Sequence, residues 1–278
     1  NEYRIIGNKA VVKISVSETI STDIFGSTSI SSSITFNTYD VINNKIVLIS
    51  VRTIVSQSGS DIFGGEWSTT SYKITQNYSD LDNDGIYTYT YIIEYTDTEG
   101  IERTLNINPF DPKYNNWETA ILEANRFNFI TKTTSTDAFG NTSTTYTTLT
   151  QTLYKGKFVT LGTVSNTTSN DVFGGTSISS STVTNNYIVD SNNYIVLSSV
   201  ATVASPQSGS DIYGNRWTQD SSITTTQRYY WNGSYYAYMY EILDATGITQ
   251  SYNPFDEATP IFIQTKTTQQ DIFNNVTH

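Results

Sequence analysis

The stretch Asp23-Ile24-Phe25-Gly26-Ser27-Thr28-Ser29-Ile30 decides the fold, because the chain repeats it as Asp171-Val172-Phe173-Gly174-Gly175-Thr176-Ser177-Ile178. The two copies lie about 148 residues apart, and two shorter segments repeat at nearly the same distance. Self-similarity at one period indicates a tandem duplication, which favours an array or scaffold ahead of a catalyst. The shorter segments are 57–62 with 207–212 and 108–111 with 253–256.

The Asp-x-x-Gly motif that begins this stretch recurs along the whole chain. Asp at the first position of a turn accepts hydrogen bonds from backbone amides ahead of it, and Gly at the fourth position adopts the left-handed backbone that closes a type I turn. We therefore expect each motif to form the tip of a β-hairpin. The motifs begin at Asp23, Asp61, Asp97, Asp137, Asp171, Asp211 and Asp244, and in altered form at Asp271.

A second class of turns lies between these tips, made of dipeptides that two-residue hairpins prefer. Two alternating sets of turns predict an up-and-down antiparallel meander in an all-β protein. The period of two in residues 87–95 and 236–242, where Tyr and Ile share one face, supports strands there. The dipeptides are Gly7-Asn8, Asn43-Asn44, Asp84-Gly85, Lys155-Gly156, Asn192-Asn193 and Asn232-Gly233.

The duplication predicts two β-repeat units, 1–148 and 149–278, forming sandwich-like or elongated sheet modules. Only residues 116–125 break the strand pattern, and their helix formers, with Trp117 and Ile121 four apart, predict one short helix. The second copy is shorter there, so we expect it to lack the helix. It also ends before the strand that residues 141–154 supply in the first copy. We expect the chain to be a mature or excised product of a longer array, or to be completed by a neighbouring subunit.

The composition excludes several classes of partner. The chain has 15 basic against 26 acidic residues, a net charge of -11, so binding to nucleic-acid phosphates is not expected. Charged residues make up only 15%, and neutral Ser, Thr, Asn and Tyr dominate. No apolar run is long enough for a transmembrane helix. The absence of cysteine and the Asn-x-Ser/Thr sequons favour an extracellular or cell-surface location.

The sequence holds few groups for catalysis. His278 is the only imidazole and there is no cysteine, so a Ser/His/Asp triad and a His-rich metal site are not expected. Two carboxylates could still hydrolyse a glycoside, and the equivalent Glu94 and Glu241 are the first candidates. We expect no enzyme, and we keep a carboxylate-based glycosidase as the third hypothesis.

One segment has the residue types of a calcium site. Asp80, Asp82 and Asp84, followed by Gly85, resemble the first half of a calcium loop. Tyr91 stands where such a loop needs its last carboxylate, and the second copy has no carboxylate in this turn. A hairpin turn explains both copies, so calcium is only a possible ligand here, and no other cofactor is expected.

Aromatic residues suggest a sugar-binding surface. Trp67 and Trp217 follow equivalent turns, and stacking of flat rings on sugars beside Asn and Asp is the usual chemistry of glycan recognition. Packing between strands also explains the pattern and is the favoured interpretation. The tyrosines that would extend this surface are Tyr89, Tyr91, Tyr236 and Tyr238.

The chain also repeats the residue types of a Lys-to-Asn amide crosslink, which forms in some bacterial adhesin domains beside a buried carboxylic acid. The alternative is that the lysines are solvated and that each asparagine opens a turn before proline. The two sets are Lys132, Asn108 and Glu94, and Lys266, Asn253 and Glu241.

These features favour an extracellular structural or adhesive repeat protein, a component of a filament, stalk or surface lattice that self-associates through open sheet edges. The alternative is a carbohydrate-binding module that uses Trp and Tyr faces. Self-association and binding to glycans are therefore the two kinds of partnership that the sequence predicts.

Overall fold

A computed structural model describes residues 1–80, 87–219, 222–255 and 263–277. It is nearly all antiparallel β-structure, with 67% of residues in strands and 4% in helices, which confirms the predicted all-β meander. The chain divides into two compact units. Unit 1 is Asn1–Ala138 with Thr152–Val159, and unit 2 is Phe139–Gln151 with Thr160–His278. The repeat border near residue 148 falls within a strand and stays a prediction.

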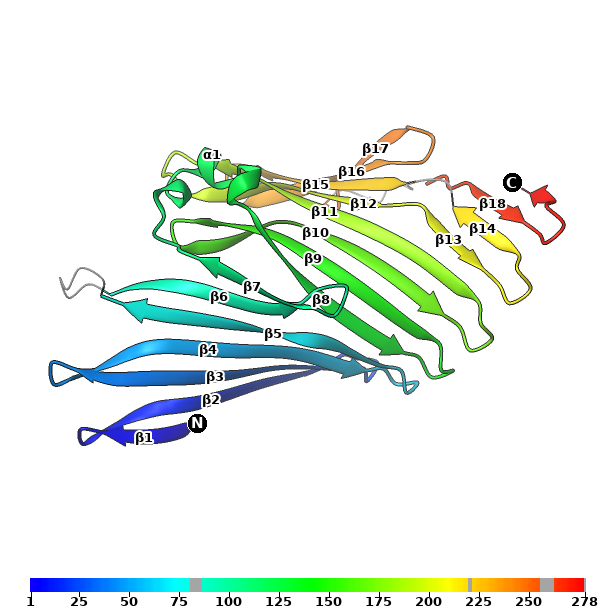
Figure 1. Cartoon of the computed structure of the whole chain (residues 1–278). Coiled ribbons are helices and arrows are strands. Elements are labelled where there is room, and N and C mark those ends of the chain that lie inside the picture. The colour runs from blue at the N-terminus through cyan, green and yellow to red at the C-terminus, as the bar shows by residue number, and fades with distance from the viewer. Residues whose placement is uncertain (81–86, 220–221, 256–262, 278) are drawn as a thin grey trace. The chain divides into compact units, whose positions relative to one another are not determined.

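The strands of unit 1 follow one another as a meander, coloured blue to green in Figure 1. The fifth strand forks the sheet, because residues 66–69 pair with β8 while residues 73–79 pair with β6. The strands are β1 (Glu2–Ile6), β2 (Lys9–Thr22), β3 (Thr28–Ile42), β4 (Lys45–Ser60), β5 (Glu66–Ser79), β6 (Thr88–Thr96), β7 (Glu102–Ile107) and β8 (Phe127–Thr136).

The short helix expected near 116–125 is present in unit 1 as α1 (Trp117–Ala120). The Asn116 side chain caps its first turn by accepting from the Thr119 amide. Short 3-10 turns flank it, η1 (Pro112–Tyr114) and η2 (Glu123–Asn125). This insert packs on the strands, and the Thr152 hydroxyl donates to the Ala120 carbonyl over 2.6 Å.

The core of unit 1 forms around this insert. Ala120 and Leu153 have no exposed surface, and Ile93 is 1% exposed. Trp117 meets Tyr154 edge-on, with ring centroids 5.5 Å apart. The other buried apolar residues of this unit are Ile107, Pro109, Tyr114, Phe127, Phe129 and Val159.

Unit 2 contains the equivalent strands, several of them divided. Between β12 and β13 stands Pro206, which has no amide hydrogen for a ladder. The equivalent position in β4 is a bulge between Val55 and Gln57, so both copies interrupt the ladder here. The strands are β9 (Thr142–Tyr154), β10 (Lys157–Asn170), β11 (Thr176–Val189), β12 (Ile195–Ala204), β13 (Gln207–Ser210), β14 (Arg216–Gln219), β15 (Ile223–Trp231), β16 (Tyr236–Leu243), β17 (Thr249–Tyr252), β18 (Thr267–Gln270) and β19 (Val276–Thr277).

The Asp-x-x-Gly motifs form the predicted tips. In the first of them the Asp23 carboxylate accepts from the amides of Phe25 and Ser27, and Gly26 has a φ of 94°. The altered tip at Asp271 keeps the geometry with Asn274 at a φ of 66°. The same carboxylate bonds recur at Asp61, Asp97, Asp171, Asp211 and Asp244.

Two turns of the second class differ in length or position from those that the sequence predicts. Asn193 occupies the left-handed fourth position of a longer turn that Asp190 caps, as Gly does at the tips. At Asn232-Gly233 the closing bond runs from the Asn232 amide to the Tyr235 carbonyl, so the loop is Gly233-Ser234. In each case a capping side chain sets the position of the turn. Asp190 stands two residues before its dipeptide, and Asn232, the first residue of its dipeptide, accepts from the amides of Ser234 and Tyr235. Asp84-Gly85 lies outside the described residues.

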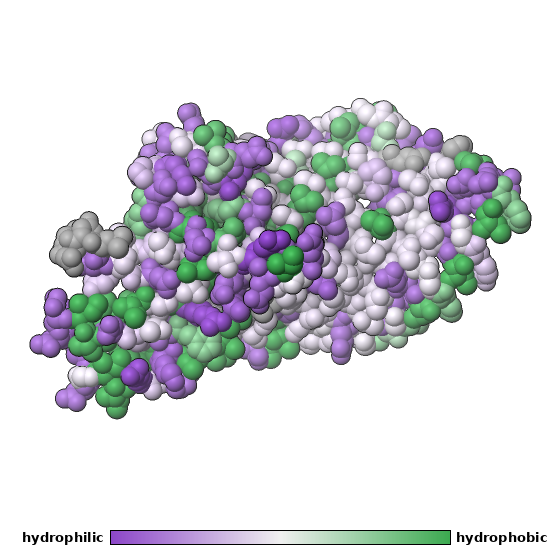
Figure 2. All heavy atoms as spheres, viewed as in Figure 1, coloured by the Kyte–Doolittle hydropathy of each residue, from purple (hydrophilic) through white to green (hydrophobic). Residues whose placement is uncertain are grey.

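Burial differs between the units. Among the described residues of unit 2 the buried side chains are Ser199, Ala237 and Asp244, so this unit has no large apolar cluster of its own. Figure 2 shows a largely pale face, on which strongly hydrophobic and strongly hydrophilic residues are scattered. Residues of intermediate hydropathy therefore make up much of this face.

Candidate ligand-binding grooves

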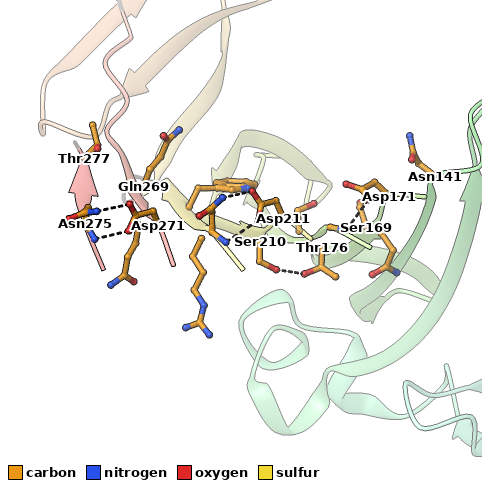
Figure 3. Close-up of a pocket in the computed structure, with 17 residues that line it drawn as sticks. Asn141, Ser169, Asp171, Thr176, Ser210, Asp211, Gln269, Asp271, Asn275 and Thr277 are labelled. Carbon is orange, nitrogen blue, oxygen red and sulfur yellow. Dashed lines mark hydrogen bonds between the residues drawn. The ribbon is translucent and has the colours of Figure 1, made fainter. Parts of the chain in front are cut away.

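Each unit carries a groove on its sheet, near the Asp-x-x-Gly tips. The unit 2 groove, of about 730 Å³, is lined by the ends of β10, β11, β13, β14, β18 and β19 (Figure 3). The unit 1 groove, of about 440 Å³, is lined by β3, β4, β5 and β8. We call them the Trp217 groove and the Trp67 groove, after the indole that lines each.

The two grooves share the same construction. In the Trp67 groove the hydroxyls of Thr28 and Ser60 lie 3.0 Å apart. In the Trp217 groove the hydroxyls of Thr176 and Ser210 lie 3.1 Å apart. The duplication therefore places a hydroxyl pair beside an indole in both units.

Each indole lies against a glycine of the neighbouring strand. A Cβ atom added to Gly59 would stand 2.4 Å from Trp67 Nε1, and one added to Gly209 would stand 2.6 Å from Trp217 Nε1. Trp67 pairs with Gly59, and Trp217 with Gly209, in the ladders. Both indoles are half-buried and line their grooves, so they combine strand packing with accessible aromatic surface.

Charge distinguishes the two grooves. Three tip carboxylates, Asp171, Asp211 and Asp271, line the Trp217 groove (Figure 3). Arg216 adds a guanidinium that forms no ion pair with any described residue, and the equivalent position in the Trp67 groove is Glu66. The Trp217 groove thus offers groups of both signs, whereas the Trp67 groove offers a carboxylate.

Hydrogen bonds favour the ionised form of two of the Trp217-groove carboxylates, Asp211 and Asp271. The Asn215 side chain donates to Asp211 over 2.7 Å, and this bond, with backbone amides, lowers the pKa of Asp211. The Asn275 side chain lowers the pKa of Asp271 in the same way, again over 2.7 Å. These groups are fixed hydrogen-bond acceptors at neutral pH.

The predicted tyrosine faces belong to packed aromatic clusters. Tyr89 touches Tyr78, Tyr91 and Phe110, with ring centroids 4.9 to 5.8 Å apart. Burial and the hydrogen bond with Tyr89 raise the pKa of Tyr91 to about 12.

In unit 2, Tyr238 packs against Tyr240 and Phe255, whereas Tyr236 is exposed beside Trp231. The structure places none of these four tyrosines in a tryptophan groove.

The remaining predicted sites stay predictions. Of the calcium-like set, Asp82 and Asp84 lie outside the described residues, and the described part of the chain holds no group of three metal-ligating side chains. In the crosslink sets Asn108 is exposed, and Asn108 and Asn253 each accept from a backbone amide of the turn that follows.

The two candidate glutamates also have neighbours that the structure identifies. Glu241 pairs with Arg228 over 2.8 Å, and Glu94 lies opposite Lys73 in the ladder. Lys132 lies in β8 of unit 1, and Lys266 is exposed in unit 2.

Sequence reasoning treated the tips as turns and overlooked the aromatic residue at their third position. Six tips present a Phe or Tyr whose side chain is 72% to 81% exposed. The signal was present as the recurring Asp-x-Phe/Tyr pattern. The residues are Phe25, Phe63, Phe139, Phe173, Tyr213 and Phe273.

Neighbouring tips of unit 2 also contact one another. The Val172 amide donates to Asn141 over 3.0 Å, and the Ile272 amide donates to Asn215 over 3.2 Å. A Cβ atom at Gly214 would stand 3.4 Å from Ile272, so the aliphatic residue of the Asp271 tip lies over the glycine of the Asp211 tip beside it.

A scan against protein-family models finds no match, and searches of curated proteins and of solved structures find no significant one. No helix in the described part of the chain is long and apolar enough to cross a membrane.

Proposed function

We propose that this protein is an extracellular structural or adhesive repeat protein that self-associates into a filament, stalk or surface lattice. The observation that carries the proposal is its large surface. The accessible area is 17477 Å² for 31.0 kDa, whereas two compact domains of half that mass would expose roughly 14,000 Å² together. Because this chain leaves a large surface accessible to solvent, association with other chains would stabilise it by burying part of its sheets.

The exposed apolar residues support the same proposal. Ile5, Val16 and Ile20 of the first two strands are each at least 60% exposed, and the tips add their aromatic residues. Such residues on a sheet edge favour association. The acidic net charge and the neutral polar strands would keep the free chain soluble until it assembles.

Sedimentation velocity over a concentration series tests this function. Growing polymers, or a defined oligomer that dissociates on dilution, are expected. A monodisperse monomer up to millimolar concentration would contradict it. The series is repeated with calcium and with chelator, because loss of polymers in chelator would give calcium a structural role, for which Asp80, Asp82 and Asp84 are the candidate ligands.

A second function, carbohydrate binding, is favoured by one specific observation, the duplicated grooves. Each joins a half-buried indole, a hydroxyl pair and fixed polar groups, which are the contacts that sugars make with proteins. Glycan-array binding that Trp217→Ala abolishes would support it. Phe173→Ala, which removes an exposed ring outside the groove, is the matched control.

Catalysis is the third hypothesis. Hydrolysis of a glycoside that is lost in Glu94→Gln would support a glycosidase. Glu241, the equivalent carboxylate, forms an ion pair with Arg228, which favours a structural role at that position.

A further inference from the structure

Four exposed aromatic rings of unit 2 stand in one row, at the same end of neighbouring strands. They belong to the turn that leads into β9 and to the tips of the β10–β11, β13–β14 and β18–β19 hairpins (Figure 1). The ladder joins β9 to β10, β11 to β13 and β14 to β18, so these turns are neighbours. The rings are Phe139, Phe173, Tyr213 and Phe273, each 72% to 81% exposed.

Aliphatic side chains fill the spaces between the rings. A Cβ atom added to Gly140 would stand 3.1 Å from Val172, and one added to Gly174 would stand 3.5 Å from Ile212. Val172, Ile212 and Ile272, which each precede a ring, are 48% to 55% exposed. The four rings and these three residues therefore form a continuous apolar strip, and exposed strips of this kind mark interaction sites on proteins. We call it the aromatic tip row.

The turn itself does not require an aromatic residue. The tip at Asp244 has the same carboxylate bonds and a left-handed Gly247 at a φ of 82°, but its third residue is Thr246. This tip closes the β16–β17 hairpin, which pairs with β15 and, in the described part of the chain, with no strand of the row. The tip at Asp97 in unit 1 likewise carries Glu99. Aromatic residues therefore follow the row and are not part of the chemistry of the turn.

The groups beside the rings favour a sugar over a lipid surface. Asp171 and Asp211 stand two residues before Phe173 and Tyr213, and both acidic residues are exposed. Ionised carboxylates are costly to bury in a bilayer, and the net charge of -11 opposes anionic headgroups. The apolar face of a pyranose stacks on an aromatic ring, while its hydroxyls donate hydrogen bonds to carboxylates. The row offers both kinds of contact.

The spacing of the rings indicates the kind of glycan. Neighbouring strands lie about 4.8 Å apart, so successive tips, two strands apart, are separated by about 10 Å. Alternate sugars of an extended β-1,4-linked glycan repeat at nearly the same distance. Adjacent strands are also rotated by about 20–25°, so the row turns by about 40–50° from one tip to the next. A single glycan chain can follow this twist through its glycosidic bonds, whereas the flat face of a crystalline fibre cannot.

We propose that the aromatic tip row binds a single extended β-1,4-linked glycan chain. Alternate sugars stack on successive rings, and hydroxyls of the glycan donate to the tip carboxylates. This inference goes beyond the proposed self-association, because one copy of unit 2 carries the whole row, and it does not use the indoles of the two grooves.

Oligosaccharides of increasing length test the geometry. Titration calorimetry with the whole protein uses β-1,4-linked oligomers of glucose and of N-acetylglucosamine, from the disaccharide to the hexasaccharide. A trisaccharide is the first to reach two rings and a pentasaccharide the first to reach three. Affinity should therefore rise about two- to tenfold at each of these lengths and change little at the tetrasaccharide and the hexasaccharide.

The control ligands are α-1,4-linked glucose oligomers of the same lengths, which coil and should not bind. Equal rises with each added sugar would overturn the alternate stacking. Absence of binding to both β-1,4-linked series, or equal binding of the α-1,4-linked series, would overturn the site. Binding to crystalline cellulose or chitin without binding to the soluble oligomers would overturn the single-chain ligand.

Protein variants test the rings. Phe173→Ala and Tyr213→Ala should each weaken binding of the pentasaccharide about two- to tenfold, because each removes one stacking face. Phe173→Trp keeps that face and should bind as the parent does. Tyr194→Ala removes a ring that is 67% exposed but lies outside the row, so it is the matched control and should leave binding unchanged. Equal effects of Phe173→Ala and Tyr194→Ala would contradict the assignment.

Two results would give the row another role. Loss of glycan binding in Trp217→Ala with full binding in Phe173→Ala would place the glycan in the Trp217 groove. Co-sedimentation with phosphatidylcholine vesicles that Phe173→Ala abolishes would make the row a membrane contact. Either result overturns this inference.

Sedimentation velocity separates this inference from the proposed function. Glycan binding at the row by a chain that remains monomeric upholds the site and counts against self-association. Polymers that Phe173→Ala disperses, from a chain that binds no oligosaccharide, uphold self-association and overturn the glycan site.

Discussion

Gly59 and Gly209 are the residues at which a side chain has no room, because an indole of the neighbouring strand occupies the space. A Cβ atom at Gly59 would stand 2.4 Å from Trp67 Nε1 and 2.5 Å from the Thr28 carbonyl oxygen. The carbonyl belongs to the backbone, so removing the indole alone would not relieve the clash. A glycine is therefore needed here because neighbouring atoms occupy the space of a Cβ atom, and not because of its own backbone conformation.

We expect Gly59→Ala and Gly209→Ala each to lower the free energy of unfolding by about 1–3 kcal/mol, since either the ring or the ladder must move. Urea denaturation measures the change. Ser58→Ala, one residue away in the same strand, is the control and should have a much smaller effect. If Gly59→Ala left the free energy of unfolding unchanged, the packing of Trp67 against Gly59 would be contradicted.

The tip carboxylates should make stability depend on acid pH. The Ile101 amide and the Arg103 side chain lower the pKa of Asp97, and the Asn215 and Asn275 side chains lower those of Asp211 and Asp271. A lowered folded-state pKa contributes stability above the unfolded value near 4, which is lost as the pH falls through the folded value.

The urea midpoint should therefore fall steadily below about pH 4. The triple variant Asp97→Asn, Asp211→Asn and Asp271→Asn keeps a side-chain oxygen at each cap but removes the charge. Its midpoint should depend less on pH in this range. An unchanged slope would show that other carboxylates dominate acid unfolding.

Among the elements, the α1 insert contributes most to the core. Trp117 and Ala120 are buried against Tyr154 and Thr152 of β9. Trp117→Ala should lower the free energy of unfolding by about 3–5 kcal/mol, because a large buried ring leaves a cavity.

Leu122, two residues beyond α1, is 56% exposed, so Leu122→Ala is the control and should stay within about 1 kcal/mol of the parent. Chemical denaturation followed by tryptophan fluorescence and by circular dichroism measures both variants. Similar losses for Trp117→Ala and Leu122→Ala would refute the core position of this ring.

The hairpin tips are elements of the opposite kind. Their aromatic rings are exposed, so Phe173→Ser, Tyr213→Ser and Phe273→Ser should each change the free energy of unfolding by less than about 0.5 kcal/mol. Thermal unfolding checks this. A large loss would mean that the rings are covered in solution, as in an assembly, and the loss would then depend on protein concentration.

At the scale of the whole molecule, local rules predicted the strands and the tips because those depend on short-range chemistry. The Asp23 tip and the Asn116 cap follow from bonds within a few residues, and α1 follows from a local run of helix formers. The fork at β5 could not be predicted, because residues 66–69 pair with β8, more than sixty residues away, and no local sequence pattern indicates that pairing.

The candidate site was predicted only in part. Trp67 and Trp217 were identified by their equivalent positions, but the glycines beneath them and the charge contrast of Glu66 with Arg216 depend on cross-strand neighbours. Tyr89 and Tyr91 resembled a binding face because alternation does not reveal which side of a sheet another element covers.

The unequal cores predict unequal stability. Unit 1 contains nearly all the buried apolar residues of the described chain, so it should unfold at a higher urea concentration than unit 2. Hydrogen exchange should show the slowest amides in 107–129 and 152–159. A single cooperative transition with uniform exchange would contradict this order.

Residues 152–159 belong to unit 1, although the predicted repeat border near 148 assigns them to the second copy. Residues 139–148 belong to unit 2, although that border assigns them to the first copy. The predicted sequence repeat and the compact structural unit therefore have different boundaries. If recombination added one more sequence repeat to the gene, the two ends of the added segment would pack with the preceding and the following repeat. Addition of such repeats would preserve every junction, whereas one repeat alone would not be a complete module.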